Sequence, residues 1–297
     1  MALTTYVLGL DYGTNSVRAL LVDVADGREV ASATWTYAHG REGVILSRDP
    51  NLARQHPSDY VEGAVRVIRK VLATARREQR GFQPSQVAGM GVDTTGSTPI
   101  PVDASGRPLA LHRRWASNLA ALAWLWKDHT AAAEAAEITA LAREMRPHYL
   151  AKCGGTYSSE WLFSKVLHCR RTAPEVFNAA YLWVECSDWV PAMLTGTEAP
   201  DRLTVGVCAA GHKAMYSEEW GGYPDAEFLG RLDPALGALR ARMRPTARTV
   251  DHPAGRLTKE WARRTGLPAG LPVASGALDA HLGAVGAGIA PGTLAII

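Results

Sequence analysis

A polar turn near the start of the chain has residue types suited to holding a phosphate group. The segment Asp11-Tyr-Gly-Thr-Asn-Ser-Val-Arg18 lies between two apolar runs. A glycine at position 13 would let backbone N–H groups approach an anion closely, and the next three side chains would add donors. Asp11 would offer a hard oxygen ligand to Mg²⁺. The same residue types are usual in ordinary hairpin turns, so the turn alone leaves both interpretations open.

Two hairpins and a helix would position this turn. The apolar run from Tyr6 to Leu10 precedes the turn, and a second run follows it, breaks at Asp26-Gly27 and continues to about Tyr37. This pattern predicts three antiparallel strands. Pro57 is a good first helical residue. Apolar residues then recur at helical spacing as far as Ala75, which predicts an amphipathic helix lying on the sheet.

A further strand carries a second carboxylate to its end. The apolar run from Val87 to Val92 ends in Asp93-Thr-Thr-Gly-Ser97, and residues 98–103 indicate another strand. Asp93 could bond a hydroxyl group of a ligand or cap the turn. Gly96 could let a ligand lie against the backbone. Strands, a helix and further strands in this order predict a mixed α/β fold.

Most of the remaining chain is predicted to be helical. Thr130 would cap a helix to about Arg143, and Ser158 or Ser159 would cap a second helix. The other expected elements are a short helix from Ser187 or Asp188 to Gly196, a Gly-rich and Pro-rich surface segment over residues 221–253, a helix from Thr258 to about Gly266, a strand over 272–276 and a helix from Asp279.

Composition narrows the class of protein. The chain has 297 residues, of which 47% are hydrophobic and 21% charged, as expected for a globular protein. The net charge of +3 is small and its positive residues are scattered, so we expect no nucleic-acid partner. Four cysteines lack C-x-x-C spacing, which favours free thiols. No apolar run approaches the roughly 18 residues of a membrane span. We therefore expect a cytoplasmic protein without a membrane partner.

Several blocks of sequence together resemble the FGGY carbohydrate kinases, and within them the ribulokinase branch. The blocks that carry the resemblance are 8-Leu-Gly-Leu-Asp-Tyr-Gly-Thr-Asn-Ser, 91-Gly-Val-Asp-Thr-Thr-Gly-Ser-Thr-Pro, 125-Leu-Trp-Lys-Asp-His-Thr, 154-Gly-Gly-Thr-Tyr-Ser-Ser-Glu-Trp, 185-Glu-Cys-Ser-Asp-Trp-Val-Pro, 210-Ala-Gly-His-Lys, 220-Trp-Gly-Gly-Tyr-Pro and 275-Ser-Gly-Ala-Leu-Asp-Ala-His-Leu-Gly. The resemblance runs from Leu8 to the last residue.

The resemblance implies a fold and a domain plan. The fold would be the ribonuclease-H-like α/β core of the sugar kinase, Hsp70 and actin superfamily. It would have a mixed five-stranded sheet, flanking helices and a helical insertion over about 109–251. Residues 1–290 would form the sugar-binding lobe, and 291–297 the first strand leading to an absent ATP-binding lobe. We therefore expect a fragment that lacks useful kinase turnover alone.

The resemblance also assigns roles to particular residues. Asp279 would be the catalytic base, although the residues alone favour a helix cap; the helix dipole would keep its carboxylate ionised at an ordinary pKa. The sugar would contact Gly96, Ser97, Trp126, Asp128, Lys213 and Asp279. The phosphates would contact Gly13, Thr14, Asn15, Ser16 and Arg18, and Asp11 would bind the metal.

The implied activity is transfer of the γ-phosphoryl group of ATP, with Mg²⁺, to the terminal hydroxyl of L-ribulose, a step of arabinose catabolism. The partners would be the sugar and ATP, and a homodimer is compatible with them. Three alternatives stay open: a non-catalytic sugar-binding or regulatory lobe, a kinase for another pentulose or pentitol, and an Hsp70-like or actin-like ATPase. The last gives no reason for the Trp-Lys-Asp-His block or for Asp279.

Overall fold

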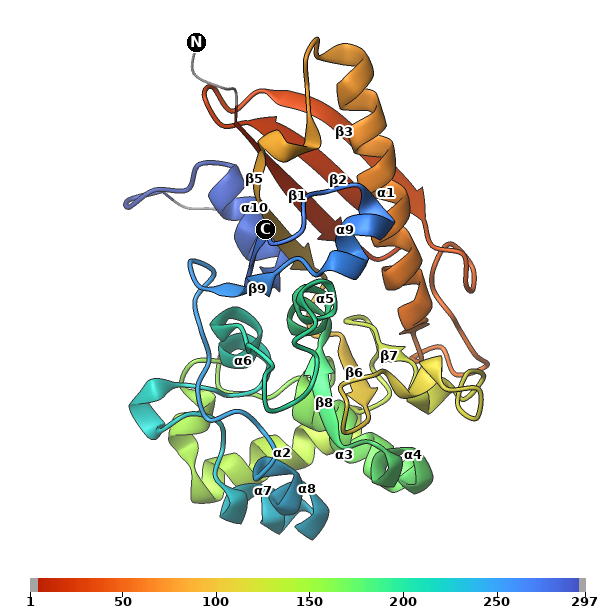
Figure 1. Ribbon diagram of the computed structural model, residues 1–297. Coiled ribbons are helices and arrows are strands. Elements are labelled where there is room, and N and C mark those ends of the chain that lie inside the picture. The colour runs from red at the N-terminus through yellow and green to blue at the C-terminus, as the bar shows by residue number, and fades with distance from the viewer. Residues whose placement is uncertain (1–4, 294–297) are drawn as a thin grey trace.

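A seven-stranded mixed sheet forms one half of the computed structural model, which describes residues 5–293, and helices form most of the other half (Figure 1). The strand order is β3-β2-β1-β5-β10-β9, with β11 also paired to β5. The strands are β1 (Tyr6–Tyr12), β2 (Ser16–Asp23), β3 (Glu29–Thr36), β5 (Val87–Thr94), β9 (Pro253–Arg256), β10 (Pro272–Ala274) and β11 (Ala277–Leu278). The predicted mixed sheet is confirmed. The predicted number of five strands is wrong, because the short strands β9 and β11 show no strand pattern in the sequence.

The long helix α1 (Pro57–Glu78) covers one face of the sheet, where it packs on β2 and β3. Alternate side chains of β1 point toward it: Tyr6, Leu8, Leu10 and Tyr12 are all buried. The helix buries its own apolar stripe, including Ala64, Ile68, Val71, Leu72 and Ala75. The predicted helix and its first residue, Pro57, are confirmed.

The opposite face of the sheet carries the side chains that the sequence analysis predicts to be functional. Because β-strand side chains alternate, Asp11 lies on the face away from the buried residues of β1. Parallel pairing of β1 with β5 places Asp93 directly beside Asp11. Helix α10 (Asp279–Gly286) begins where β11 ends and lies near β5. The turn after β1, the end of β5 and the start of α10 are therefore brought to one edge.

The region between β5 and β9 forms the helical half. It contains α2 (Ala132–Met145), α3 (Leu162–Thr172), α4 (Pro174–Ala179), α5 (Cys186–Thr195), α6 (Val207–Lys213), α7 (Ala226–Leu232) and α8 (Pro234–Arg240). Helix α9 (Lys259–Thr265) instead packs beside α1 in the sheet half (Figure 1). Two small sheets join β4 (Arg54–Gln55) to β7 (Ala123–Trp124) and β6 (Pro99–Val102) to β8 (Leu182–Glu185).

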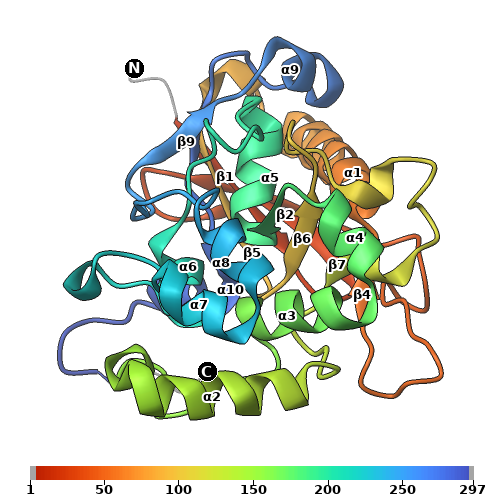
Figure 2. The same ribbon diagram turned by 90° about the horizontal axis from the view of Figure 1, so that it is seen from below.

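Single 3₁₀ turns cover Pro84–Gln86, Leu109–Leu111, Leu119–Ala121, Pro147–Leu150 and Glu218–Trp220. Helix α5 lies between the two halves (Figure 1), and in the view from below it lies near the centre of the molecule (Figure 2).

Helix boundaries follow capping chemistry only in part. Thr258 accepts a hydrogen bond from Trp261 N–H and caps α9, and α5 and α9 end at Gly196 and Gly266 as predicted. The predicted cap by Thr130 is wrong, because its hydroxyl donates to Asp128 and α2 begins at Ala132. The predicted cap by Ser158 or Ser159 is also wrong, because α3 begins at Leu162.

The expected irregular segment over 221–253 contains two helices instead. Asp225 accepts from Phe228 N–H to cap α7, and Asp233 accepts from Ala235 N–H to cap α8. Helix α7 buries Phe228, Leu229 and Leu232, and helix α8 buries Leu236 and Leu239, so apolar side chains anchor both short helices. The glycine and proline content of the segment indicated an irregular surface segment. The two capping residues, Asp225 and Asp233, were the signal for helices that this prediction did not use.

The prediction of free thiols is confirmed for all four cysteines. Among residues 5–293, no helix is long and apolar enough to cross a membrane. The predicted strand over 291–297 falls largely outside the described residues.

Candidate active site

Three carboxylates converge at the carboxyl ends of the parallel strands. Asp11 and Asp93 are register partners on β1 and β5, and Ala277 of β11 pairs with Asp93 on its other side. Asp279 follows β11 directly and is the first residue of α10. The sheet register, which sequence spacing does not encode, therefore gathers these three acids.

Burial and neighbouring negative charge raise the pKa of two of these groups, Asp93 and Asp279. Burial raises the pKa of Asp93 to about 7, and the negative charges of Asp11 and Asp279 act in the same direction. Burial likewise raises the pKa of Asp279, with a further increase from Asp11, while Ala280 N–H, His281 and Lys213 oppose it. The expectation of an ordinary pKa for Asp279 was wrong, because desolvation outweighs the favourable field of the helix start.

A cavity of about 470 Å³ opens beside Asp11 and Asp93, with Arg18 and Leu282 among its lining residues. Arg18 Nε donates to Asp11 Oδ2 at 2.9 Å, so Arg18 is paired with the predicted metal ligand. Asp93 Oδ1 is buried and has no hydrogen-bond partner. Over residues 5–293, no cluster of three or more His, Cys, Asp or Glu is arranged to hold a metal. The carboxylates nevertheless suit Mg²⁺, which takes one or two carboxylates together with substrate phosphates.

The turn after β1 is held by the protein's own groups. Gly13 N–H donates to Ser16 O at 2.9 Å, and Gln55 Nε2 donates to the Gly13 and Thr14 carbonyls at 3.3 and 2.8 Å. The Asn15 side-chain amide donates to Glu42 O. Asn15 is thus directed away from the role of phosphate donor that the sequence suggested, whereas Ser16 and Thr14 remain at the edge of the turn.

Two predicted sugar-contacting residues reach this edge from the helical half. Trp126 is 37% exposed, and its indole N–H donates to Thr14 Oγ1 at 3.0 Å, which joins the two predicted subsites. Lys213 is the last residue of α6, and its Nζ lies 5.5 Å from the centre of the Trp161 ring. Leu278 N–H donates to Cys208 Sγ at 3.5 Å, which ties α6 to the residue before Asp279.

Three other predicted sugar contacts are committed to the protein interior. Asp128 is fully buried, forms an ion pair with Arg54 and accepts from Ala53 N–H at 2.8 Å. Ser97 is fully buried and its hydroxyl donates to Glu185. A Cβ atom at Gly96 would lie 2.0 Å from Leu278 Cδ2, so this glycine serves close packing. The structure does not bring the side chains of Asp128 and Ser97 to the site.

Several residues that support the site were missed by the sequence analysis. Arg54, Gln55, Lys165 and Glu185 are all buried. The burial of Lys165 could have been predicted from the sequence, because this lysine lies inside the apolar helical run Leu162-Phe-Ser-Lys-Val-Leu167. Charged residues are almost never fully buried unless paired. A lysine in such a run therefore indicates a buried cation with specific partners.

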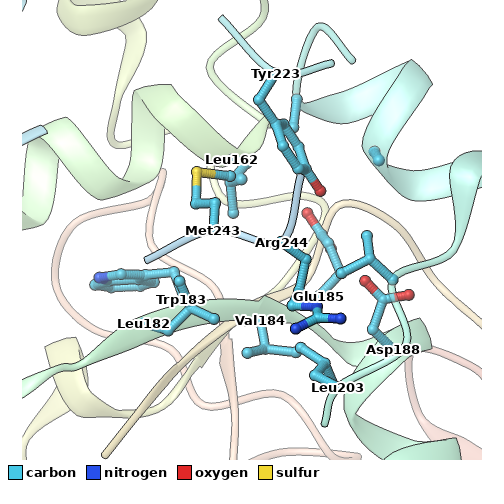
Figure 3. Close-up of a pocket in the computed structure, with 13 residues that line it drawn as sticks. Leu162, Leu182, Trp183, Val184, Glu185, Asp188, Leu203, Tyr223, Met243 and Arg244 are labelled. Carbon is cyan, nitrogen blue, oxygen red and sulfur yellow. The ribbon is translucent and has the colours of Figure 1, made fainter. Parts of the chain in front are cut away.

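A separate cavity of about 30 Å³ lies in the helical half, with Glu185, Asp188 and Arg244 among its lining residues (Figure 3). Burial raises the pKa of Asp188, although Gly206 N–H donates to its carboxylate. The volume suits one or two water molecules. This cavity is too small for a sugar, so it is no candidate for the substrate site.

Comparison with known sequences identifies close resemblances. Residues 6–286 match the family model for the FGGY family of carbohydrate kinases, N-terminal domain. The chain is 43% identical over 284 residues to a ribulokinase from Vibrio parahaemolyticus, covering 95% of this chain and 49% of that protein. It is 39% identical to a ribulokinase from Shouchella clausii, covering 98% and 51%. The chain spans about half the length of the curated relatives it matches.

Solved structures share the fold. The crystal structure of xylulose kinase from Rhodospirillum rubrum superposes with a TM-score of 0.70 at 26% identity, covering 96% of this chain and 51% of that one. Plasmodium falciparum glycerol kinase with ADP gives a TM-score of 0.70 at 13% identity, covering 95% and 49%. These likenesses confirm the α/β fold that the sequence predicted.

Proposed function

Because the chain belongs to the FGGY family of carbohydrate kinases, we propose that it forms the sugar-binding half of an ATP-dependent kinase that phosphorylates ribulose. The identity to ribulokinases over almost the whole chain supports the choice of sugar. The observation that carries the proposal is the convergence of Asp279, Lys213 and Trp126 beside the turn at residues 13–16.

The chemistry assigned to this site is in-line phosphoryl transfer. The terminal hydroxyl oxygen of the sugar attacks the γ-phosphorus of ATP; the new P–O bond forms while the bond to the leaving ADP oxygen breaks. The hydroxyl proton passes to an Asp279 carboxylate oxygen. Lys213 places a positive charge near Asp279, where it offsets negative charge on the transferring group.

The other residues would bind and orient the substrates. Trp126 offers an exposed aromatic ring to the C–H face of the sugar, and its bond to Thr14 fixes the ring beside the phosphate turn. Asp11 and Asp93 would hold Mg²⁺, which offsets the charge of the triphosphate when bound. Release of Arg18 from Asp11 would free that guanidinium for a phosphate.

Isothermal titration calorimetry with L-ribulose, ribitol and ATP separately tests this proposal. We expect L-ribulose to bind and Trp126→Ala to weaken its binding by about tenfold, or about 1.4 kcal/mol, since the ring would bury roughly 50 Å² of apolar surface against the sugar at about 25 cal/mol per Å². Tyr181→Ala is the matched control, because Tyr181 is another aromatic residue with 37% exposure and lies outside the site.

The other outcomes separate the alternatives. ATP binding without affinity for any sugar would contradict the proposal and favour an Hsp70-like or actin-like ATPase. Tighter binding of ribitol than of L-ribulose would favour a pentitol kinase. Equal loss of affinity in Trp126→Ala and Tyr181→Ala would remove Trp126 from the site.

A further inference from the structure

A lysine at the centre of the helical half has an unusual set of partners. Lys165 on α3 is fully buried, and its ammonium donates to the backbone carbonyls of Ser97, Trp124 and Leu125 at 2.9, 3.2 and 2.8 Å. Three acceptors require three N–H donors, and only the protonated amine has three. The geometry therefore fits a buried ammonium ion.

A buried carboxylate supplies the opposite charge. Glu185 at the end of β8 accepts from the Ser97 hydroxyl and from Thr98 N–H at 2.8 Å. Burial raises the pKa of Glu185, whereas Ser97 and Lys165 lower it. Lys165 and Glu185 thus bind the segment at residues 97–98 through separate atoms, and each favours the charged form of the other.

The carbonyls that Lys165 binds belong to two different buried segments that border the site. Ser97 follows Gly96, which packs against Leu278, the residue before Asp279. Trp124 and Leu125 precede Trp126, whose indole bonds to the turn after β1. These segments lie far apart in sequence, and Lys165 contacts both with one atom.

The segment that contains Trp126 is also fixed from its other side. The Arg54 guanidinium lies 3.5 Å from the centre of the Trp124 ring, and Arg54 pairs with buried Asp128. Displacing the backbone at residues 124–125, which precedes Trp126, would therefore break bonds of Lys165. A structural lysine elsewhere in the core would lack this connection to both sides of the site.

We propose that Lys165 is a positioning residue that sets the spacing between the Gly96 side and the Trp126 side of the sugar site. The proposal rests on the proposed function for its consequence, the affinity for a pentulose. Lys165 does not touch the sugar; it holds the two backbone segments from which the site is built.

The test compares Lys165→Met with Val71→Ala. Methionine keeps the length and apolar stem of lysine but donates no hydrogen bonds. Val71 is fully buried on α1, so its truncation lowers stability in a part of the core outside the site. L-ribulose affinity is measured at a temperature where circular dichroism shows both variants to be folded. We expect about tenfold or greater loss for Lys165→Met and no loss for Val71→Ala.

A double-mutant cycle with Trp126→Ala separates positioning from general destabilisation. If Lys165 acts through Trp126, the double variant binds L-ribulose no more weakly than the weaker single variant. Lys165→Arg, which keeps the charge and the donors, should restore part of the affinity. Independent, additive losses, or unchanged affinity in Lys165→Met, would overturn the proposal.

Hydrogen exchange of the ligand-free chain gives a second readout. Lys165→Met should speed amide exchange in peptides covering both 94–100 and 122–128, and Val71→Ala should not do so selectively. If wild-type protein binds no sugar, the proposed function fails and this exchange pattern alone decides the positioning role. If Lys165→Met does not fold, Lys165→Gln takes its place, with the same expected pattern, because a glutamine amide has two N–H donors and no charge. Unchanged exchange in both peptides would contradict the proposal.

Discussion

The neighbours of Asp279 have opposite effects on the pKa of its carboxyl group. Burial and Asp11 favour the protonated carboxyl, whereas Ala280 N–H and Lys213 favour the carboxylate. A general base must be ionised to accept a proton, so a raised pKa moves the base toward the working pH and increases its proton affinity. Catalysis should therefore decline as the pH falls through that raised pKa.

Replacing the base should affect the rate far more than binding. In an active kinase that carries this lobe, Asp279→Asn keeps the shape of the side chain but cannot take the proton. We expect kcat to fall by about 10² to 10⁴ with little change in sugar affinity. Thermal stability is the control, because Asp279 is the first residue of α10 and not its cap, and Asn keeps the shape of the side chain. A variant that retains more than about a tenth of the wild-type kcat would assign Asp279 a structural role only.

Asp93 should make folding stability depend on pH. Its pKa rises from 3.8 to about 7 on folding, so the folded chain holds this proton more tightly than the unfolded chain. The stabilisation is complete below about pH 4 and is lost as the pH rises through about 7. Asp93→Asn should remove this dependence and be more stable than wild type at pH 8 by on the order of 2 kcal/mol, allowing for partial solvent exposure. Urea denaturation at pH 5 and pH 8 measures the difference, and parallel pH profiles for the two proteins would refute it.

At the scale of elements, the loop after strand β5 packs against the end of strand β11 at a glycine without space for a side chain. Gly96→Ala would place a Cβ atom 2.0 Å from Leu278 Cδ2 and displace the residue before Asp279. We expect a loss of about 1–3 kcal/mol in stability, together with weaker sugar binding. Gly89→Ala within β5 is the control, because its Cβ position meets only Pro272 O at 3.8 Å, an ordinary contact. Equal behaviour of the two variants would show that this contact is unimportant.

The segment over residues 123–128 depends on a buried ion pair. Asp128→Ala would leave the Arg54 guanidinium buried without its partner and should cost about 3–5 kcal/mol in the free energy of unfolding. Glu62→Ala breaks an exposed ion pair with Arg66 and should cost less than about 1 kcal/mol. Chemical denaturation compares the two. A mild effect of Asp128→Ala would return Asp128 to the candidates for sugar binding.

Elements with a regular pattern could be predicted from the sequence, and polar tertiary partners could not. Residues 6–37 and helix α1 show clear strand and helix periods, because each buries one face on the other. The helices capped by Asp225 and Asp233 are too short to show a period. The sequence analysis predicts that Asp128 and Ser97 contact the sugar, whereas the structure buries both against Arg54 and Glu185. These partners lie far away in sequence, so the sequence alone does not reveal the burial. The family resemblance predicts which residues form the site, but only the fold separates the exposed residues among them from the buried ones.

At the scale of the whole molecule, the sheet and the helical half share one apolar core. A single connected cluster of buried side chains includes Leu8 and Val71 on one side and Phe163 and Phe228 on the other. We expect one cooperative unfolding transition. Seven of the nine tryptophans lie between residues 103 and 252, so fluorescence follows the helical half, while hydrogen exchange in β1 and β2 follows the sheet. Two separated transitions would contradict this prediction.

The strand order has a consequence for the time course of folding. Strands β1, β2 and β3 pair with their neighbours in sequence, whereas β10 and β11 join β5 only after the entire helical half has intervened. Local pairings form quickly, and pairings that close a long loop form slowly. The turn at residues 13–16 is thus assembled early during synthesis, and Asp279 docks near it only after residues 95–278 have been made. The segment that we propose to bind phosphate therefore forms long before the residue that we propose as the base is in place.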